Sequence, residues 1–267
     1  MSGSFADRIV VAPDGTVIGA WRTGSGTPIV LVHGSADDHT AWDSVAAHLA
    51  LRMEVHAIDR RGRGASPWTG PVYAIEQEFD DVAAVVDSTG TPTWLFGQGY
   101  GADIALGAAL RTRNLAGLIL YEPAPGIPTV EADTLAEAER RLEAGDRDGA
   151  LTLMLDAVLG LDPAAIAAVR AGPGWQASVD QTATMPRELR AEADWRPTGY
   201  GDLVLPTLLL LGSRSPDWAA RWTAMAQTAI PESRLEMLDD QGHLALLTAP
   251  ELVARKVIDF VFDPSRS

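Results

Sequence analysis

Three glycines at alternate positions, Gly97, Gly99 and Gly101, mark the stretch of this sequence that is best suited to chemistry. The apolar residues 94–96 before them predict a short buried strand, and residues 102–110 after them predict a helix. In a G-x-S-x-G turn between a strand and a helix, a serine exposes its hydroxyl as a nucleophile. Here the central residue is glycine, so the sequence predicts the scaffold for acyl transfer without its nucleophile. Glycines at such a junction are also ordinary turn residues, so the rest of the chain must distinguish the two interpretations.

No neighbouring side chain is expected to replace the missing hydroxyl. We expect Gln98 and Tyr100 to point away from the tip of the turn, and Asp103 lies one turn into the predicted helix. Glycine tolerates the unusual dihedral angles of such a turn. The missing side chain is expected to leave a space of about one water molecule at the tip.

The sequence predicts strands that alternate with helices at both ends of the chain. The strands are expected at 8–12, 17–21, 28–32, 54–58, 93–96, 115–121, 207–211 and 234–238. The helices are expected at 41–49, 75–87, 102–113, 217–229 and 250–262. Continuous apolar strands that alternate with helices indicate an α/β fold with a parallel sheet covered on both faces.

The region between these two ends has no strand candidate. Four of its segments favour helix, namely 134–144, 150–159, 163–171 and 186–193. We therefore predict a core of residues 1–122 and 206–267, with a helical cap, or lid, inserted at 123–205.

Composition restricts the classes of partner. The net charge of −15 and the sequence pI of about 4.6 disfavour nucleic acid and anionic membranes. The chain has no cysteine, which excludes disulfides, thiolate catalysis and cysteine-ligated zinc. No apolar run is long enough to span a bilayer and no secretory signal pattern is visible, so we expect a cytoplasmic protein. We also expect no metal, no cofactor, and a monomer or homodimer that binds a small molecule.

Four motifs follow one another on this framework in a recognisable order. They are Val30-Leu31-Val32-His33-Gly34, the polar loop 59–66, the glycines of the turn at 97–101, and Gly242-His243. With these motifs the chain resembles the α/β-hydrolase superfamily, most closely the lid-bearing relatives of small esterases, haloalkane dehalogenases and epoxide hydrolases. The resemblance covers nearly all of residues 8–262 and implies an α/β-hydrolase fold with a mostly parallel eight-stranded sheet. We interpret residues 60–66 as structural.

The resemblance also implies a base and the acid that orients it. His243, in the loop after the last strand, matches the position of the superfamily's base. The acid usually follows the seventh strand, where residues 212–215 here contain no carboxylate. Some members place it at the end of the sixth strand, where this chain has Glu122, and Asp217 and Asp240 remain as alternatives.

The remaining site residues are expected around this base. The resemblance implies that the backbone N–H groups of Tyr100 and Ser35 form an oxyanion hole. Candidate substrate-binding residues are His33, Gly34, Trp42, Gln98, Trp175 and Trp195. Tryptophans in a cap are also ordinary core residues; if these line the site, the substrate is small and largely apolar. Residues 37–39 fit either the mouth of the site or a solvated loop.

Three functional hypotheses remain open at this point. In the first, His243 and Glu122 act as a general base on water or on the substrate's own oxygen, without an acyl-enzyme. The outcomes would be water addition, elimination, decarboxylation or cyclisation. In the second, the protein is a serine esterase or C–C hydrolase in which the serine at position 99 has been substituted. In the third, it is a non-catalytic binder of a small ligand.

Overall fold

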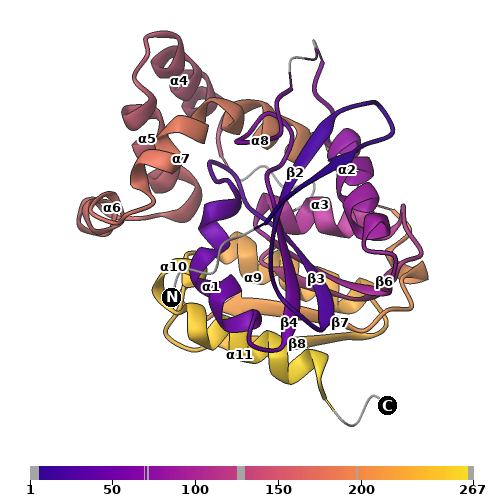
Figure 1. Cartoon of the computed structure of the whole chain (residues 1–267). Coiled ribbons are helices and arrows are strands. Elements are labelled where there is room, and N and C mark those ends of the chain that lie inside the picture. The colour runs from indigo at the N-terminus through magenta and orange to yellow at the C-terminus, as the bar shows by residue number, and fades with distance from the viewer. Residues whose placement is uncertain (1–5, 69, 71, 125–129, 197, 264–267) are drawn as a thin grey trace.

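An eight-stranded sheet forms the centre of the computed structural model, which describes residues 6–68, 70, 72–124, 130–196 and 198–263 (Figure 1). The strands lie in the order β1-β2-β4-β3-β5-β6-β7-β8. β2 is antiparallel to β1 and β4, and every other neighbouring pair is parallel. The strands are β1 (Ala6–Val11), β2 (Val17–Gly24), β3 (Thr27–Val32), β4 (Met53–Ile58), β5 (Thr93–Gln98), β6 (Leu115–Tyr121), β7 (Thr207–Gly212) and β8 (Ser233–Leu238).

Helices cover both faces of this sheet because alternate residues of its strands point in opposite directions. Val30 and Val32 of β3 belong to an apolar cluster that includes residues of α2 (Ile75–Ser88), α3 (Tyr100–Ala109) and α9 (Asp217–Ala229). Ile29 and Leu31 belong to a second cluster, which includes residues of α1 (Asp43–Leu49) and α11 (Pro250–Val261). The fold is therefore the mostly parallel, doubly covered eight-stranded sheet that the sequence predicts. Its helical elements are η1 (His39–Trp42), α1 (Asp43–Leu49), α2 (Ile75–Ser88), α3 (Tyr100–Ala109), α9 (Asp217–Ala229), α10 (Ala245–Thr248) and α11 (Pro250–Val261).

Between β6 and β7 the described residues form helices and no strand. These elements are α4 (Ala132–Glu143), α5 (Arg147–Leu159), α6 (Pro163–Arg170), α7 (Trp175–Gln181), η2 (Thr182–Thr184), α8 (Met185–Asp194) and η3 (Tyr200–Asp202). We call α4–α8 the cap helices; they stand together on one side of the molecule, with α6 outermost (Figure 1). The sequence does not predict α7, a short helix directly behind Gly172-Pro173-Gly174. Part of the predicted start of the cap, residues 125–129, lies outside the described residues.

The cap helices have their own apolar cluster. Its buried members include Leu135, Leu151, Met154 and Leu189, and one residue from the sheet domain, Ala36, joins them. The cap therefore packs directly on the loop that follows β3. Within the described ranges, no helix combines the length and the apolar character needed to cross a lipid bilayer.

Candidate active site

The turn between β5 and α3 has the backbone conformation that the sequence indicates. Gly99 has φ 53° and ψ −126°, which residues with a side chain rarely adopt. A β-carbon on Gly97 would lie 2.1 Å from the carbonyl oxygen of Gly101. A β-carbon on Gly101 would lie 2.3 Å from the carbonyl oxygen of Val32. The flanking glycines are therefore needed for close packing between β5, α3 and the end of β3.

His243 and Glu122 form a close pair at this turn. The distance from His243 Nδ1 to Glu122 Oε2 is 2.6 Å. Glu122 is fully buried, and its Oε1 accepts hydrogen bonds from the Gly212 N–H, at 2.7 Å, and from the Ser215 hydroxyl. These contacts hold both carboxylate oxygens in place, so Glu122 can orient the imidazole. Of the alternatives, Asp240 forms an exposed ion pair with Arg214 and Asp217 is the first residue of α9.

Gln98 corrects one of our expectations, because its side chain points toward the base and not away from it. Gln98 Nε2 lies 2.8 Å from Nε2 of His243 and 3.4 Å from the carbonyl oxygen of His243. Its Oε1 lies beside Gly34, where an added β-carbon would be 2.6 Å from that oxygen. The amide therefore lies between the loop after β3 and the imidazole.

These contacts define one protonation arrangement for the imidazole. An amide N–H can only donate, so Nε2 of His243 accepts from Gln98. The proton of the neutral ring is then on Nδ1, where it is donated to Glu122. A base with its lone pair on Nε2 is in the form required to remove a proton from a substrate.

The tip of the turn faces this base directly. A β-carbon on Gly99 would lie 3.0 Å from Nε2 and 3.3 Å from Cε1 of His243. Tyr100 does point away, as expected, and its hydroxyl lies 2.8 Å from that of Tyr73. As the first residue of α3, Tyr100 has a backbone N–H without an intrahelical acceptor. The oxyanion role of Tyr100 and Ser35 stays a prediction.

His33 and Trp42 are placed in structural positions. His33 is fully buried, its Nδ1 lies 2.9 Å from the Gly34 carbonyl oxygen, and its Nε2 accepts from the Arg60 N–H at 3.2 Å. Burial lowers the pKa of His33 well below its ordinary value, and the charges of Arg63 and Arg60 add to this effect. Trp42 is fully buried and packs edge-on against Phe96. We therefore assign both rings to the core and not to substrate binding.

The tryptophans of the cap region also make contacts away from the base. Trp175 Nε1 donates to Asp148 Oδ1 at 2.9 Å, and Trp195 packs on Phe79 with ring centroids 4.9 Å apart. Trp218 of α9 contacts His243 edge-on, with ring centroids 5.4 Å apart. Trp218 is not among the predicted site residues; its place soon after the seventh strand, beside the alternative acid Asp217, was the available signal.

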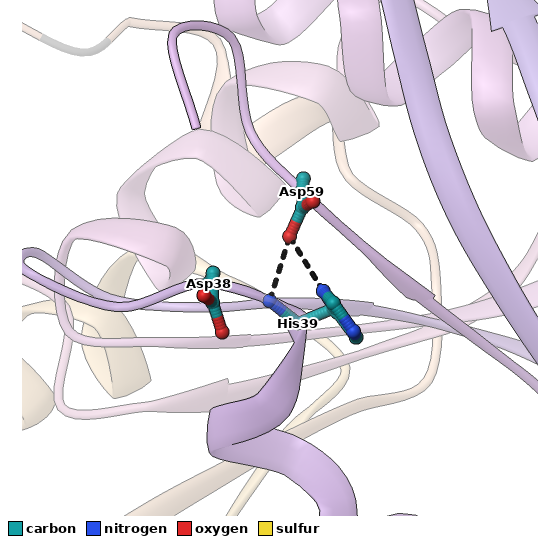
Figure 2. A group of neighbouring side chains, drawn as sticks. All are labelled: Asp38, His39 and Asp59. Atoms are coloured by element: carbon teal, nitrogen blue, oxygen red, sulfur yellow. Dashed lines mark hydrogen bonds and ion pairs between the residues drawn. The ribbon is translucent and has the colours of Figure 1, made fainter. Parts of the chain in front are cut away.

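Figure 2 shows three side chains of the types that bind metals, Asp38, His39 and Asp59. Asp59 Oδ1 accepts from the backbone N–H of His39 at 2.9 Å and from its ring Nδ1 at 2.8 Å. Asp38 instead caps η1 by accepting from the Thr40 N–H at 2.9 Å. Burial lowers the pKa of His39, but the hydrogen bond and charge of Asp59 outweigh it and the pKa is raised. The group thus fastens the loop after β3 to the loop after β4.

One more carboxyl group of the loop after β3 is electrostatically linked to the site. Burial raises the pKa of Asp37 to about 6, although the positive charge of Arg63 opposes this shift. A protonated His243 would lower the pKa of Asp37, so this residue lies within electrostatic range of the base. The two hydrogen bonds to Asp59 fix His39, so a solvated loop does not describe that residue, whereas Asp37 and Asp38 are half-buried.

Several known proteins resemble all or part of this chain. A family model described as the alpha/beta hydrolase family matches residues 29–256. The sequence of this chain is 31% identical to that of an alpha/beta hydrolase from Sphaerobacter thermophilus. The crystal structure of that protein matches this fold with a TM-score of 0.83 over 95% of this chain and 99% of that chain. The 2-(acetamidomethylene)succinate hydrolase of Mesorhizobium japonicum is 24% identical over 89% of each protein. The probable oxidoreductase EphD of Mycobacterium tuberculosis is 36% identical over 101 residues, and the match spans only 17% of that protein.

Proposed function

Because the chain belongs to the alpha/beta hydrolase family, we propose that it is an enzyme in which His243, oriented by Glu122, acts as a general base. No nucleophilic side chain is present at residue 99, so the reaction would proceed without an acyl-enzyme. The base would activate water or an oxygen of the substrate itself. Water addition, elimination, decarboxylation and cyclisation are the reactions of this class.

The observation that carries the proposal is the alignment of one imidazole between a carboxylate and an amide. Glu122 lies at 2.6 Å on the Nδ1 side, and Gln98 lies at 2.8 Å on the Nε2 side. When Nε2 takes up a proton, the ring becomes an imidazolium, which the buried carboxylate of Glu122 stabilises. The same carboxylate keeps the ring in one orientation throughout.

Gln98 would change partners during the reaction. Its amide donates to Nε2 of His243 in the free protein, so this hydrogen bond must break before Nε2 can accept a proton. The released amide can then donate to an oxygen of the substrate. Backbone N–H groups of Tyr100 and Ser35 would stabilise negative charge that develops on a neighbouring oxygen.

Removing the imidazole tests this function. Wild type and His243→Ala are incubated with a panel of small esters, epoxides and β-keto acids, and products are followed by mass spectrometry. Loss of a general base should lower the rate about 10²–10⁴-fold. His48→Ala, which changes a histidine of α1 outside the His243–Glu122–Gln98 group, is the matched control. A substrate that is converted equally fast by wild type and His243→Ala would rule out the proposed base.

A second candidate function is a serine esterase or C–C hydrolase whose serine at position 99 has been substituted. The observation in its favour is the direction of the missing side chain, since a β-carbon on Gly99 would face Nε2 of His243 at 3.0 Å. That is the relation between a nucleophile and its base in a serine hydrolase. The Gly99→Ser variant separates the two candidates.

A further inference from the structure

The loop after β3, residues 33–38, is held in a conformation that its own sequence does not favour. Ala36 has φ 55°, in the left-handed region that costs energy for a residue with a side chain. Ala36 is also buried and belongs to the apolar cluster of the cap helices. Such strain persists only where the surroundings determine the backbone conformation. The cap helices are therefore part of what shapes this loop.

Glu188 of α8 provides the polar part of this contact. Its side chain is fully buried, and its Oε2 accepts a hydrogen bond from the hydroxyl of Ser35 at 2.8 Å. Its Oε1 forms ion pairs with Arg60, at 3.0 Å, and with Arg63. Arg60 in turn donates from Nη1 to the carbonyl oxygen of Gly34 at 2.9 Å. One carboxylate of the cap thus holds two consecutive residues of the loop, one directly and one through Arg60.

The same network extends to the other side of the site. Arg60 forms two hydrogen bonds with Glu78, at 2.8 and 2.9 Å. Glu78 accepts from the hydroxyl of Tyr73 at 2.6 Å, and that hydroxyl lies 2.8 Å from the hydroxyl of Tyr100. Polar side chains therefore connect Ser35 to Tyr100 through Glu188 and Arg60. These end points are the two residues whose backbone N–H groups are the expected oxyanion donors.

Charge keeps α8 in this position. Glu188 is the carboxylate that pairs with Arg63 within the described part of the chain, and both side chains are buried. Moving α8 away would remove the carboxylate that contacts the buried guanidinium of Arg63, which is unfavourable.

We propose that Glu188 is a positioning residue: from the cap, it fixes the loop at residues 33–38 relative to Tyr100 and so couples docking of α8 to the geometry of the oxyanion hole. This inference rests on the proposed function for its catalytic meaning. The coupling itself is a property of the folded chain and can be measured without a substrate.

The experiment is hydrogen–deuterium exchange on the full-length chain, comparing wild type with Glu188→Gln. Glutamine has the same size but no charge, so the pairs with Arg60 and Arg63 are weakened without creating a cavity. Exchange at residues 33–38 and at the start of α3 should rise by at least about ten-fold. The matched control is Glu139→Gln, which removes a charge from an ion pair between α4 and Arg190 of α8 at the surface. It should leave exchange in both segments unchanged.

Two results would overturn the inference. The first is a folded Glu188→Gln protein in which residues 33–38 exchange as in wild type, and the second is a rise spread evenly over the whole chain. If Glu188→Gln does not fold, Ser35→Ala decides, because it removes the loop's hydrogen bond and keeps the ion pairs of Glu188. Exchange at 33–38 should then rise, and an unchanged loop would contradict the coupling. Failure of the proposed function would instead appear as unchanged turnover in His243→Ala, which this measurement does not involve.

Discussion

Gly99→Ser is the substitution that separates the two candidate functions, and the structure allows its effect to be estimated. Residue 99 has φ 53° and ψ −126°, which costs a residue with a side chain about 1–3 kcal/mol. The new β-carbon would lie 3.0 Å from Nε2 of His243, which is tighter than ordinary packing. His243 cannot easily move, because Glu122 and Gln98 hold it at 2.6 and 2.8 Å. Losing one of these hydrogen bonds adds about 1–2 kcal/mol.

The expected total is a destabilisation of about 2–5 kcal/mol. For a chain of this size each kcal/mol lowers the melting temperature by roughly 2 °C, so a decrease of roughly 4–10 °C is expected. Calorimetry measures the melting temperature. Gly99→Ala is the matched control, because it introduces the same backbone strain and the same β-carbon without a hydroxyl.

Labelling with a fluorophosphonate, detected by intact-mass spectrometry, measures whether the new serine reacts. We expect slow labelling of Gly99→Ser, because the hydrogen bond from Gln98 to Nε2 of His243 must break before the imidazole can accept the serine proton. A Gly99→Ser protein that is as stable as wild type, is labelled rapidly and hydrolyses esters with burst kinetics would refute this reasoning. The protein would then be a serine hydrolase with a substituted nucleophile.

Three further substitutions test other parts of the site. Glu122→Gln keeps the shape of the side chain but removes the charge that stabilises the imidazolium of His243. Turnover of the substrates tested with His243→Ala should therefore fall about 10²–10⁴-fold. An unchanged rate would exclude Glu122 as the orienting acid. Burial and the nearby charge of Glu192 raise the pKa of Asp103 well above its ordinary value. The carboxyl group of Asp103 therefore binds its proton more tightly in the folded chain than in the unfolded chain. Stability then falls as pH rises from the pKa of Asp103 in the unfolded chain to its pKa in the folded chain. Melting curves across the acidic and neutral range measure how the free energy of unfolding changes with pH. Asp103→Asn should reduce this change by up to about 1.4 kcal/mol per pH unit. The control Asp156→Asn, at an exposed position of α5, should leave it unchanged. Trp42→Ala should lower the free energy of unfolding, measured with denaturant, by about 3–5 kcal/mol, because this ring is fully buried. A loss of substrate affinity with little loss of stability would show instead that Trp42 binds substrate.

The fold and part of the site could be predicted from local patterns. Apolar runs and helical spacing depend on neighbouring residues, so the strands and most helices were predicted close to their observed ends. The glycines at 97, 99 and 101 are needed for backbone geometry and close packing, which is why their spacing identified the turn. The positions of His243 and Glu122 came from the resemblance to a family, and the structure brings the two side chains together across 121 positions.

Tertiary structure alone decided which side chains meet. Gln98 contacts a residue 145 positions away, and nothing in its neighbours indicates that its amide turns toward the base. Trp42 and Trp218 are the same residue type, yet one is enclosed in the core while the other contacts His243. The pairing of Glu188 with Arg60 and Ser35 likewise joins residues 128 and 153 positions apart. Local sequence determines whether a segment becomes strand, turn or helix, because backbone preferences are local. The partners of a buried polar group depend instead on how the sheet and helices pack, because only in the folded chain do distant segments lie within hydrogen-bonding distance.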